Sequence, residues 1–183
     1  SCYGQPPEIQ RVLPPVTPYI DALAQAGARF ERFYTHAPTT LSSHATLLTG
    51  LDPHGHAIPR NGYPLGADVP TLATRLSEAG WEPVAAVGSA VLERGMGLDR
   101  GFTVYDDDLP GVEGRAEDRA LGVVQRALAA VDGRSQPDKP LFLWVHLWDP
   151  HGPFAAPEPW HELFADPAYD GPLRGSWSRA SYV

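Results

Sequence analysis

The run LFLWVHLW at residues 141–148 constrains the fold of this chain more than any other segment. A short and almost wholly apolar run is typical of a β-strand that is covered on both faces, because it lacks the alternation of a half-exposed strand. Strands of this kind belong to parallel sheets that lie between layers of helices. The run therefore predicts an α/β fold.

The beginning of the chain predicts a helix followed by a strand. Thr17-Pro18 supplies a cap and a first-turn proline, and Gly27 is expected to end the helix. Residues 28–35 then alternate enough to predict a strand, with Phe30 and Phe33 as its apolar anchors.

Later segments repeat this order. A second helix is expected over 69–79, closed by Gly80, and a short buried strand over 81–88. A third helix is expected over 115–131. Its apolar face is predicted to hold Leu121, Val124, Leu128 and Val131. Alternating helices and buried strands indicate an α/β sandwich with a mostly parallel sheet.

Composition excludes several classes of function. The 183 residues include 43% hydrophobic ones, enough for the core of one domain, and the net charge of -8 argues against a nucleic-acid binder. A single cysteine, Cys2, excludes an internal disulfide framework. No apolar run approaches the roughly 20 residues of a membrane-spanning helix. Because the chain starts with Ser1 rather than Met, we expect it to be a piece of a longer protein.

Hydroxyl side chains gather at the expected start of a short apolar helix, in TTLSSHATLLTG at residues 39–50. Ser42 or Ser43 is predicted to cap this helix, while Leu47 and Leu48 anchor it in the core. A helix start offers unpaired N–H groups and the positive end of a dipole, which suit a phosphate or sulfate group.

Thr40, just ahead of that helix, is expected to face a bound oxyanion. The competing interpretation is a hydroxyl that only caps the helix, which is the common role of Ser and Thr there. A threonine nucleophile also needs a metal ion or an adjacent base, because its hydroxyl loses a proton reluctantly at neutral pH.

The segment HLWDPH at 146–151 carries two histidines and a carboxylate. Strand alternation, if the strand continues, puts His146 on the face opposite Asp149 and His151, so a three-ligand metal site is not expected. His151 follows the strand at the edge where ligands gather, and it suits a general acid that protonates a departing oxygen. The alternative is a loop histidine beside an Asp-Pro turn.

A loop at 53–62, PHGHAIPRNG, adds further polar groups. Arg60 could clamp an oxyanion and Asn61 could donate a hydrogen bond to one. For His54 and His56 a solvated loop with an Asn-Gly turn is the preferred interpretation. The three aspartates at 106–108 are interpreted as a solvated turn, since consecutive carboxylates do not converge on one ion.

The chain resembles the amino-terminal half of a sulfatase domain, in the alkaline phosphatase superfamily. The order and spacing of several segments carry the resemblance, which covers most of residues 2–160. They are CYG at 2–4, residues 17–56, VPTLATRLSEAGW at 69–81, GLDRGFTVYDDD at 97–108 and WVHLWDPHGPFAAPEPW at 144–160. The resemblance implies an alkaline phosphatase-like sandwich, with residues 1–183 as a partial catalytic domain.

Sulfatases carry Cys-x-Pro-Ser-Arg ahead of Leu-x-Thr-Gly, and their cysteine becomes formylglycine, which attacks the ester. Here Thr40 takes the cysteine position, Ser42 the proline, Ser43 the serine and His44 the arginine. Without cysteine or serine at 40, no formylglycine is expected. Threonine nucleophiles do occur in related phosphodiesterases and phosphoethanolamine transferases, where metal ions activate the hydroxyl.

By the same resemblance, His151 matches the family histidine beside the leaving oxygen, and Arg60 and Asn61 fall where relatives contact the oxyanion. The family binds a divalent metal ion through aspartates on a strand before CYG and through residues on a late strand, which this chain lacks. Thr40 is then the metal ligand within this chain, with calcium expected first and zinc or manganese as alternatives.

The resemblance implies a hydrolase of sulfuric or phosphoric esters that works by metal-assisted attack from Thr40. Ser43 and His44 are expected to bind the substrate beside Arg60 and Asn61. The isolated fragment is expected to be inactive without the cation's carboxylates. Two alternatives stay open: a degenerate module that binds an anionic ligand without cleaving it, and a threonine-dependent enzyme similar to phosphoethanolamine transferases.

Overall fold

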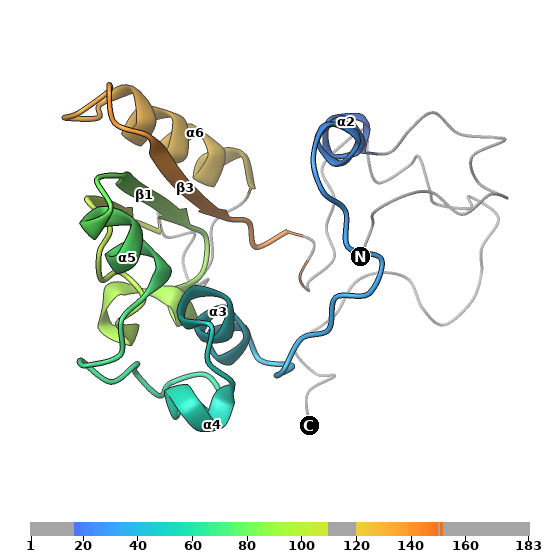
Figure 1. Cartoon of the computed structure of the whole chain (residues 1–183), viewed down its shortest axis with the longest axis vertical. Helices are drawn as coiled ribbons and strands as arrows, with labels where there is room; N and C mark the ends of the chain where they lie inside the picture. Colours follow the sequence, from blue (N-terminus) through green and yellow to red (C-terminus); the bar gives the residue numbers. More distant parts are fainter. Residues whose placement is uncertain (1–16, 110–119, 150, 152–183) are drawn as a thin grey trace, which may run out of the picture. The chain divides into compact units, whose positions relative to one another are not determined.

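The computed structural model describes residues 17–109, 120–149 and 151. The chain divides into two compact units, residues 1–35 and residues 36–183. The described part of the first unit contains the helix α2, Pro18–Ala26 (Figure 1). A proline lies in the first turn and Gly27 follows the last, so the expected start and end of this helix are confirmed.

The strand expected at 28–35 is wrong, because these residues form no regular secondary structure. Phe30 and Phe33 pack against each other with ring centroids 6.1 Å apart, and both are exposed. Residues three apart point to opposite faces of a strand, so the two anchors could not have shared one buried face.

The second unit is built on a parallel sheet of three strands. They are β1 (Glu82–Val87), β2 (Val104–Asp106) and β3 (Leu141–His146), in the order β2-β1-β3. Every residue of the central strand is buried. Parallel strands need crossover connections, and α6 (Ala120–Asp132) lies between β2 and β3 in the chain. The predicted α/β fold with a parallel sheet is confirmed.

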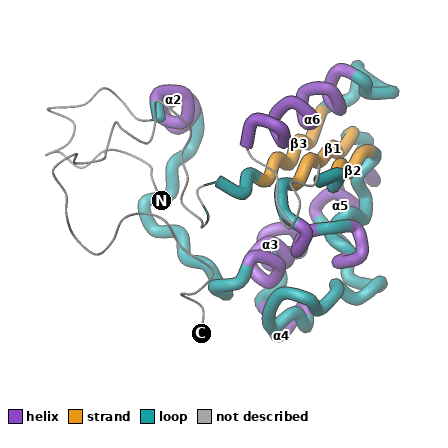
Figure 2. The backbone as a smooth tube through the Cα atoms, turned by 180° about the vertical axis from the view of Figure 1, so that it is seen from behind, coloured by secondary structure: helices purple, strands orange, loops and turns teal. Residues whose placement is uncertain are grey.

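Helices cover opposite faces of this sheet, as both views of the backbone show (Figures 1 and 2). On one face, α3 (Thr40–Thr49) contributes Leu41, Ala45 and Leu48 to a core with Ala85 and Val87 of β1. On the other face, α6 packs on Ala86 through Val123 and Ala127. Successive residues of β1 alternate between these two cores, as strand geometry requires.

The apolar face predicted for the helix at 115–131 is wrong. Leu121 is 70% exposed and Leu128 is 58% exposed, whereas Val123 and Ala127 are buried. The small side chain of Ala127 lets the helix approach the sheet. Arg126 fixes the rotation of the helix, because its Nε donates to Asp106 Oδ1 at 2.7 Å and its Nη2 to the carbonyl of Val87 at 3.0 Å.

The helix α5 (Leu72–Glu78) begins three residues later than expected. Thr71 caps it, since its hydroxyl accepts the N–H of Thr74 at 3.1 Å. The same hydroxyl donates to the carbonyl of Arg100 at 2.7 Å. This bond holds the following Gly101 against the start of α5, where an added Cβ would lie 2.1 Å from the amide nitrogen of Thr74.

The strand β3 departs from its prediction in two ways. It ends at His146 rather than at 148, and most of its side chains are half-buried rather than buried, with Leu143 exposed. Coverage on both faces is therefore not reached within the described residues. In this part of the chain, no helix has both the length and the apolar character needed to cross a membrane.

Candidate active site

The helix α3 begins at Thr40, two residues before the expected start. The predicted caps are wrong. Ser42 is buried and donates its hydroxyl to the carbonyl of Ile58 at 2.5 Å, and Ser43 donates to the carbonyl of Thr40 at 3.0 Å. Both serines lie inside the helix, where side-chain hydroxyls bond to nearby carbonyls instead of capping. Thr40 is therefore the first helical residue.

Asn61 performs the capping that was assigned to the serines. Its Oδ1 accepts the N–H of Leu41 at 2.9 Å, which satisfies one of the free donors at the helix start. At the other end Gly50 adopts φ +72°, and its N–H reaches the carbonyl of Thr46 at 2.9 Å. Leu48 is buried as expected, but Leu47 is 56% exposed and does not anchor the helix.

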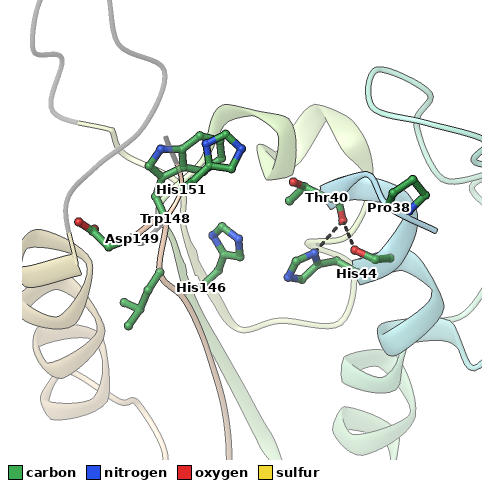
Figure 3. Close-up of a pocket in the computed structure, with 9 residues that line it drawn as sticks. Pro38, Thr40, His44, His146, Trp148, Asp149 and His151 are labelled. Atoms are coloured by element: carbon green, nitrogen blue, oxygen red, sulfur yellow. Dashed lines mark hydrogen bonds between the residues drawn. The ribbon is translucent and has the colours of Figure 1, made fainter. Parts of the chain in front are cut away.

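A cavity of about 400 Å³ lies beside the first turn of α3 (Figure 3). Its lining combines the start of that helix with the residues at the end of β3 and just after it. The lining residues are Pro38, Thr40, Ser43, His44, His146, Leu147, Trp148, Asp149 and His151. Two segments distant in the sequence thus meet at the carboxyl end of a parallel strand, where α/β folds bind ligands.

Thr40 and His151 share this cavity. In the close-up the hydroxyl of Thr40 points to the side on which His151 lies (Figure 3). The ring of His151 stacks on Trp148 with centroids 4.0 Å apart, and the backbone N–H of His151 donates to the carbonyl of Trp148 at 2.9 Å. A tight turn and an aromatic neighbour therefore orient this imidazole.

His44 is tied to the helix that carries Thr40. Its Nδ1 donates to the carbonyl of Thr40 at 2.7 Å, so the neutral ring has its lone pair on Nε2. The ring also packs on Trp144, with centroids 5.8 Å apart. Burial lowers the pKa of His44, although the bond to Thr40 opposes part of that effect.

His146 lines the same cavity as Asp149 and His151, so the prediction that it lies on the opposite face is wrong. Alternation stops because the strand ends at His146 and the chain then turns. Its ring meets His44 edge-on at 4.9 Å. Burial and the neighbouring His44 lower the pKa of His146 to about 4.

Sequence reasoning missed His146 and Trp148 as members of the site. The signal that could have found them is the Asp-Pro-His-Gly run at 149–152, whose turn residues predict an early strand end. Asp149, also in the lining, accepts the N–H of Ala120 at 2.8 Å through its Oδ2. This bond links the end of β3 to the start of α6.

Arg60 and Asn61 do not line the cavity. Arg60 is exposed, and its guanidinium lies 5.5 Å from the ring centroid of Tyr63. Asn61 accepts a hydrogen bond from α3 rather than donating one toward the cavity. Both residues therefore lie between α3 and α5, outside the lining of the cavity.

His56 is buried, which corrects its interpretation as part of a solvated loop. Its Nδ1 accepts the N–H of Ile58 at 3.1 Å, so its Nε2–H donates to Thr46 Oγ1 at 3.0 Å. Both ring nitrogens are thus used to attach the loop to α3. His54 is exposed, as expected.

The aspartates at 106–108 are not simply solvated. Asp106 pairs with Arg126 and Asp107 pairs with Arg94, at 2.7 and 3.2 Å. Within 17–109, 120–149 and 151, no three His, Cys, Asp or Glu side chains are arranged to hold a metal ion. Thr40 and the cavity around it therefore do not form a complete cation site from the described residues.

Known proteins resemble this chain over most of its length. The family model described as Sulfatase matches residues 1–174. An arylsulfatase of Clostridium perfringens is 24% identical over an aligned length of 214 residues, and the match covers 88% of this chain and 44% of the relative.

Two solved structures share the fold. The phosphonate monoester hydrolase of Agrobacterium radiobacter has a TM-score of 0.59 and 27% identity, and the match covers 81% of this chain and 39% of that one. A protein solved in complex with its substrate, D-glucosamine-2-N,6-O-disulfate, has a TM-score of 0.62 and 21% identity, with coverage of 76% and 30%. The chain spans less than half the length of each of these relatives. Because the family model matches nearly every residue, the chain belongs to the sulfatase family.

Proposed function

We propose that this protein hydrolyses sulfuric or phosphoric esters, with Thr40 as the nucleophile and His151 as the general acid. The observation that carries the proposal is the cavity of about 400 Å³ that both side chains line. Nucleophile and acid must lie on opposite sides of the reacting sulfur or phosphorus, and a shared cavity between two segments allows that arrangement.

The first step follows from the chemistry of the two groups. The hydroxyl of Thr40 gives its proton to solvent as its Oγ1 bonds to the sulfur or phosphorus centre, and the bond from that centre to the ester oxygen breaks. His151 gives its proton to that departing oxygen, which leaves as an alcohol. Water then attacks the same centre in a second step and releases the anion, which regenerates the hydroxyl of Thr40.

The start of α3 suits the anionic part of the ester. Thr40 is the first helical residue, so the ester lies at the positive end of the helix dipole. Ser43 and His44 line the cavity beside Thr40 and are proposed to contact the same group. Both give their proton to the carbonyl of Thr40, so Ser43 would turn its hydroxyl and His44 would take up a second proton to donate to the anion. Arg60 and Asn61 do not line the cavity, and their contact with the oxyanion stays a prediction.

A divalent cation, calcium by expectation, would lower the pKa of the Thr40 hydroxyl when bound. Thr40 is the ligand proposed within this chain, and the carboxylates that complete the site are expected in the parent protein.

The named activities of the relatives support an ester of this class. One relative is an arylsulfatase and another a phosphonate monoester hydrolase, while a third was solved with a disulfated sugar. Sulfate and phosphonate esters share a tetrahedral, anionic centre. We therefore propose sulfuric and phosphoric esters as the class of substrate.

The nucleophile is tested by Thr40→Ala in the full-length protein. We expect at least a thousandfold loss of turnover on aryl sulfates and phosphates, because the attacking oxygen is removed. Thr40→Ser, which keeps a hydroxyl, is the control and should retain measurable turnover. Unchanged activity in Thr40→Ala would exclude Thr40 as the nucleophile.

A second function is favoured by the altered signature at Thr40, Ser42 and His44. A degenerate sulfatase fold would bind an anionic glycan or lipid head group in the same cavity without cleaving it. Full-length protein that binds an aryl sulfate or phosphate but never releases the phenol would support this binding function over the hydrolase.

A further inference from the structure

His146 is a cavity residue to which the proposed reaction gives no task. It lies at the end of β3 and lines the cavity together with Thr40 and His151. In the close-up it lies across the cavity from Thr40 (Figure 3). Any ester held between the nucleophile and the acid would therefore meet this imidazole.

The structure holds His146 firmly. Its carbonyl accepts the N–H of Gly88 at 3.0 Å, and its Cα pairs with Val87 in the sheet register. Its ring packs edge-on against His44, which is itself bonded to the carbonyl of Thr40. The imidazole is thus fixed relative to the first turn of α3, so its position is set before any ligand binds.

The hydrogen bonding of this ring is incomplete within the described part of the chain. Its Nδ1 is buried and has no partner there. A neutral imidazole carries one proton, and buried N–H groups without an acceptor are rarer than buried acceptors without a donor. The proton is therefore favoured on Nε2, which makes that nitrogen a donor.

We infer that His146 is a further substrate-binding residue, which donates its Nε2–H to a non-bridging oxygen of the sulfate or phosphate group. The inference rests on the proposed function, because it deepens the description of that same site. Thr40 takes the attacking side and His151 the leaving oxygen, so the remaining oxygens need other donors. Asp149 does not serve, since a carboxylate repels an anion and its Oδ2 already accepts the N–H of Ala120.

The test follows the histidine ring signals of the full-length protein by NMR while inorganic phosphate, and separately inorganic sulfate, is added. We expect the signals of His146 to move and saturate, and those of the exposed His54 to stay in place. His146→Phe keeps a ring against His44 but removes the donor, and it should weaken phosphate binding by about tenfold or more, because hydrogen bonds to charged groups are the strong ones. His146→Gln restores a donor and should recover part of the affinity.

The outcomes separate this inference from the proposed function. His146 signals that stay fixed at the highest anion concentration, or equal affinity in His146→Phe and in a His54→Gln control, would overturn the inference. Amide spectra of the variants check that β1 and β3 still pair. If Thr40→Ala keeps its turnover while His146 still binds phosphate, the nucleophile proposal fails and the inference stands.

Discussion

The contacts of single side chains in this protein depend on where the helices begin and the strands end. Asn61 belongs to an exposed loop, yet its side-chain oxygen satisfies the start of α3. His146 belongs to a strand, yet its ring lies in a cavity because the strand ends there. The sequence predicted that Thr40 and His151 would matter through a family pattern. It could not predict His146, since alternation along a strand holds only while the strand continues.

Glu82 illustrates how a buried charge shapes stability at the residue scale. Burial alone would raise the pKa of its carboxyl, but the hydrogen bond and charge of Arg134, at 2.9 Å, together with Ser135, lower that pKa below its ordinary value. A carboxyl whose pKa is lower in the folded state stabilises the fold above its unfolded pKa. The contribution is lost as the pH falls through the folded pKa.

We therefore expect the free energy of unfolding of Glu82→Gln to depend less on pH in the acid range than that of the parent chain. The parent chain should lose stability on acidification below the ordinary range of a glutamate, and the variant should lose less over the same interval. Urea unfolding at a series of pH values measures both. Glu78→Gln, at an exposed pair with Arg75, is the control and should keep the parent's pH dependence. An identical slope in parent and Glu82→Gln would contradict this account.

At the scale of elements, the sequence located most helices and strands but not the faces they bury. Gly27 directly follows α2, and Gly80, at φ +87°, lies two residues beyond the end of α5, so both helices end within one residue of the predicted position. The helix α6 has several apolar residues around its circumference, and periodicity alone could not choose among them. Val123 and Ala127 are the buried residues because they face the sheet. The hydrogen bonds of Arg126 to Asp106 and Val87 fix that rotation of the helix.

Packing of α6 predicts opposite results for two neighbouring positions. Ala127→Leu should destabilise the fold by about 1–3 kcal/mol, because the larger side chain has no room between the helix and Ala86 of the sheet. Leu128→Ala should change the free energy of unfolding by only about 0.5 kcal/mol, since Leu128 is exposed. Chemical denaturation of both variants measures the difference. A larger loss in Leu128→Ala would show that the predicted face was correct.

The contact between Gly101 and α5 gives a second prediction at this scale. Gly101→Ala should cost about 2 kcal/mol or more, because φ is +87° and the new Cβ would lie 2.1 Å from the Thr74 nitrogen. Gly62→Ala is a matched control with the same φ and no atom within 4 Å of the new Cβ. It should cost only about 1 kcal/mol, from backbone strain alone. Equal losses in the two variants, by thermal or urea unfolding, would rule out the close approach as the cause.

At the scale of the whole molecule, the sequence pattern and the structure agree on the class of fold, and the family model confirms the family. Buried strands alternating with helices predicted a parallel sheet, and β2-β1-β3 is one. The strand expected at 28–35 failed because apolar content without a two-residue period does not define a strand face. The metal remained a prediction, since no three His, Cys, Asp or Glu side chains of the described residues are arranged to hold one.

Metal dependence is tested on the full-length protein. Dialysis against a chelator should abolish turnover of an aryl sulfate or phosphate, and added calcium should restore it more fully than zinc or manganese. Measurement of bound metal before and after dialysis provides the control. Full turnover in protein shown to hold no metal would remove the cation from the proposed reaction.

The hydrogen bond from the N–H of Leu41 to Asn61 links an exposed loop to the electrostatic potential at the start of α3. With that amide already satisfied, the electrostatic pull of the α3 terminus on an incoming anion is weakened by a side chain outside the cavity. Replacement of Asn61 would change this electrostatic attraction without changing a residue that lines the cavity. Substitutions in this loop are therefore expected to change the affinity for the proposed anion from outside the cavity.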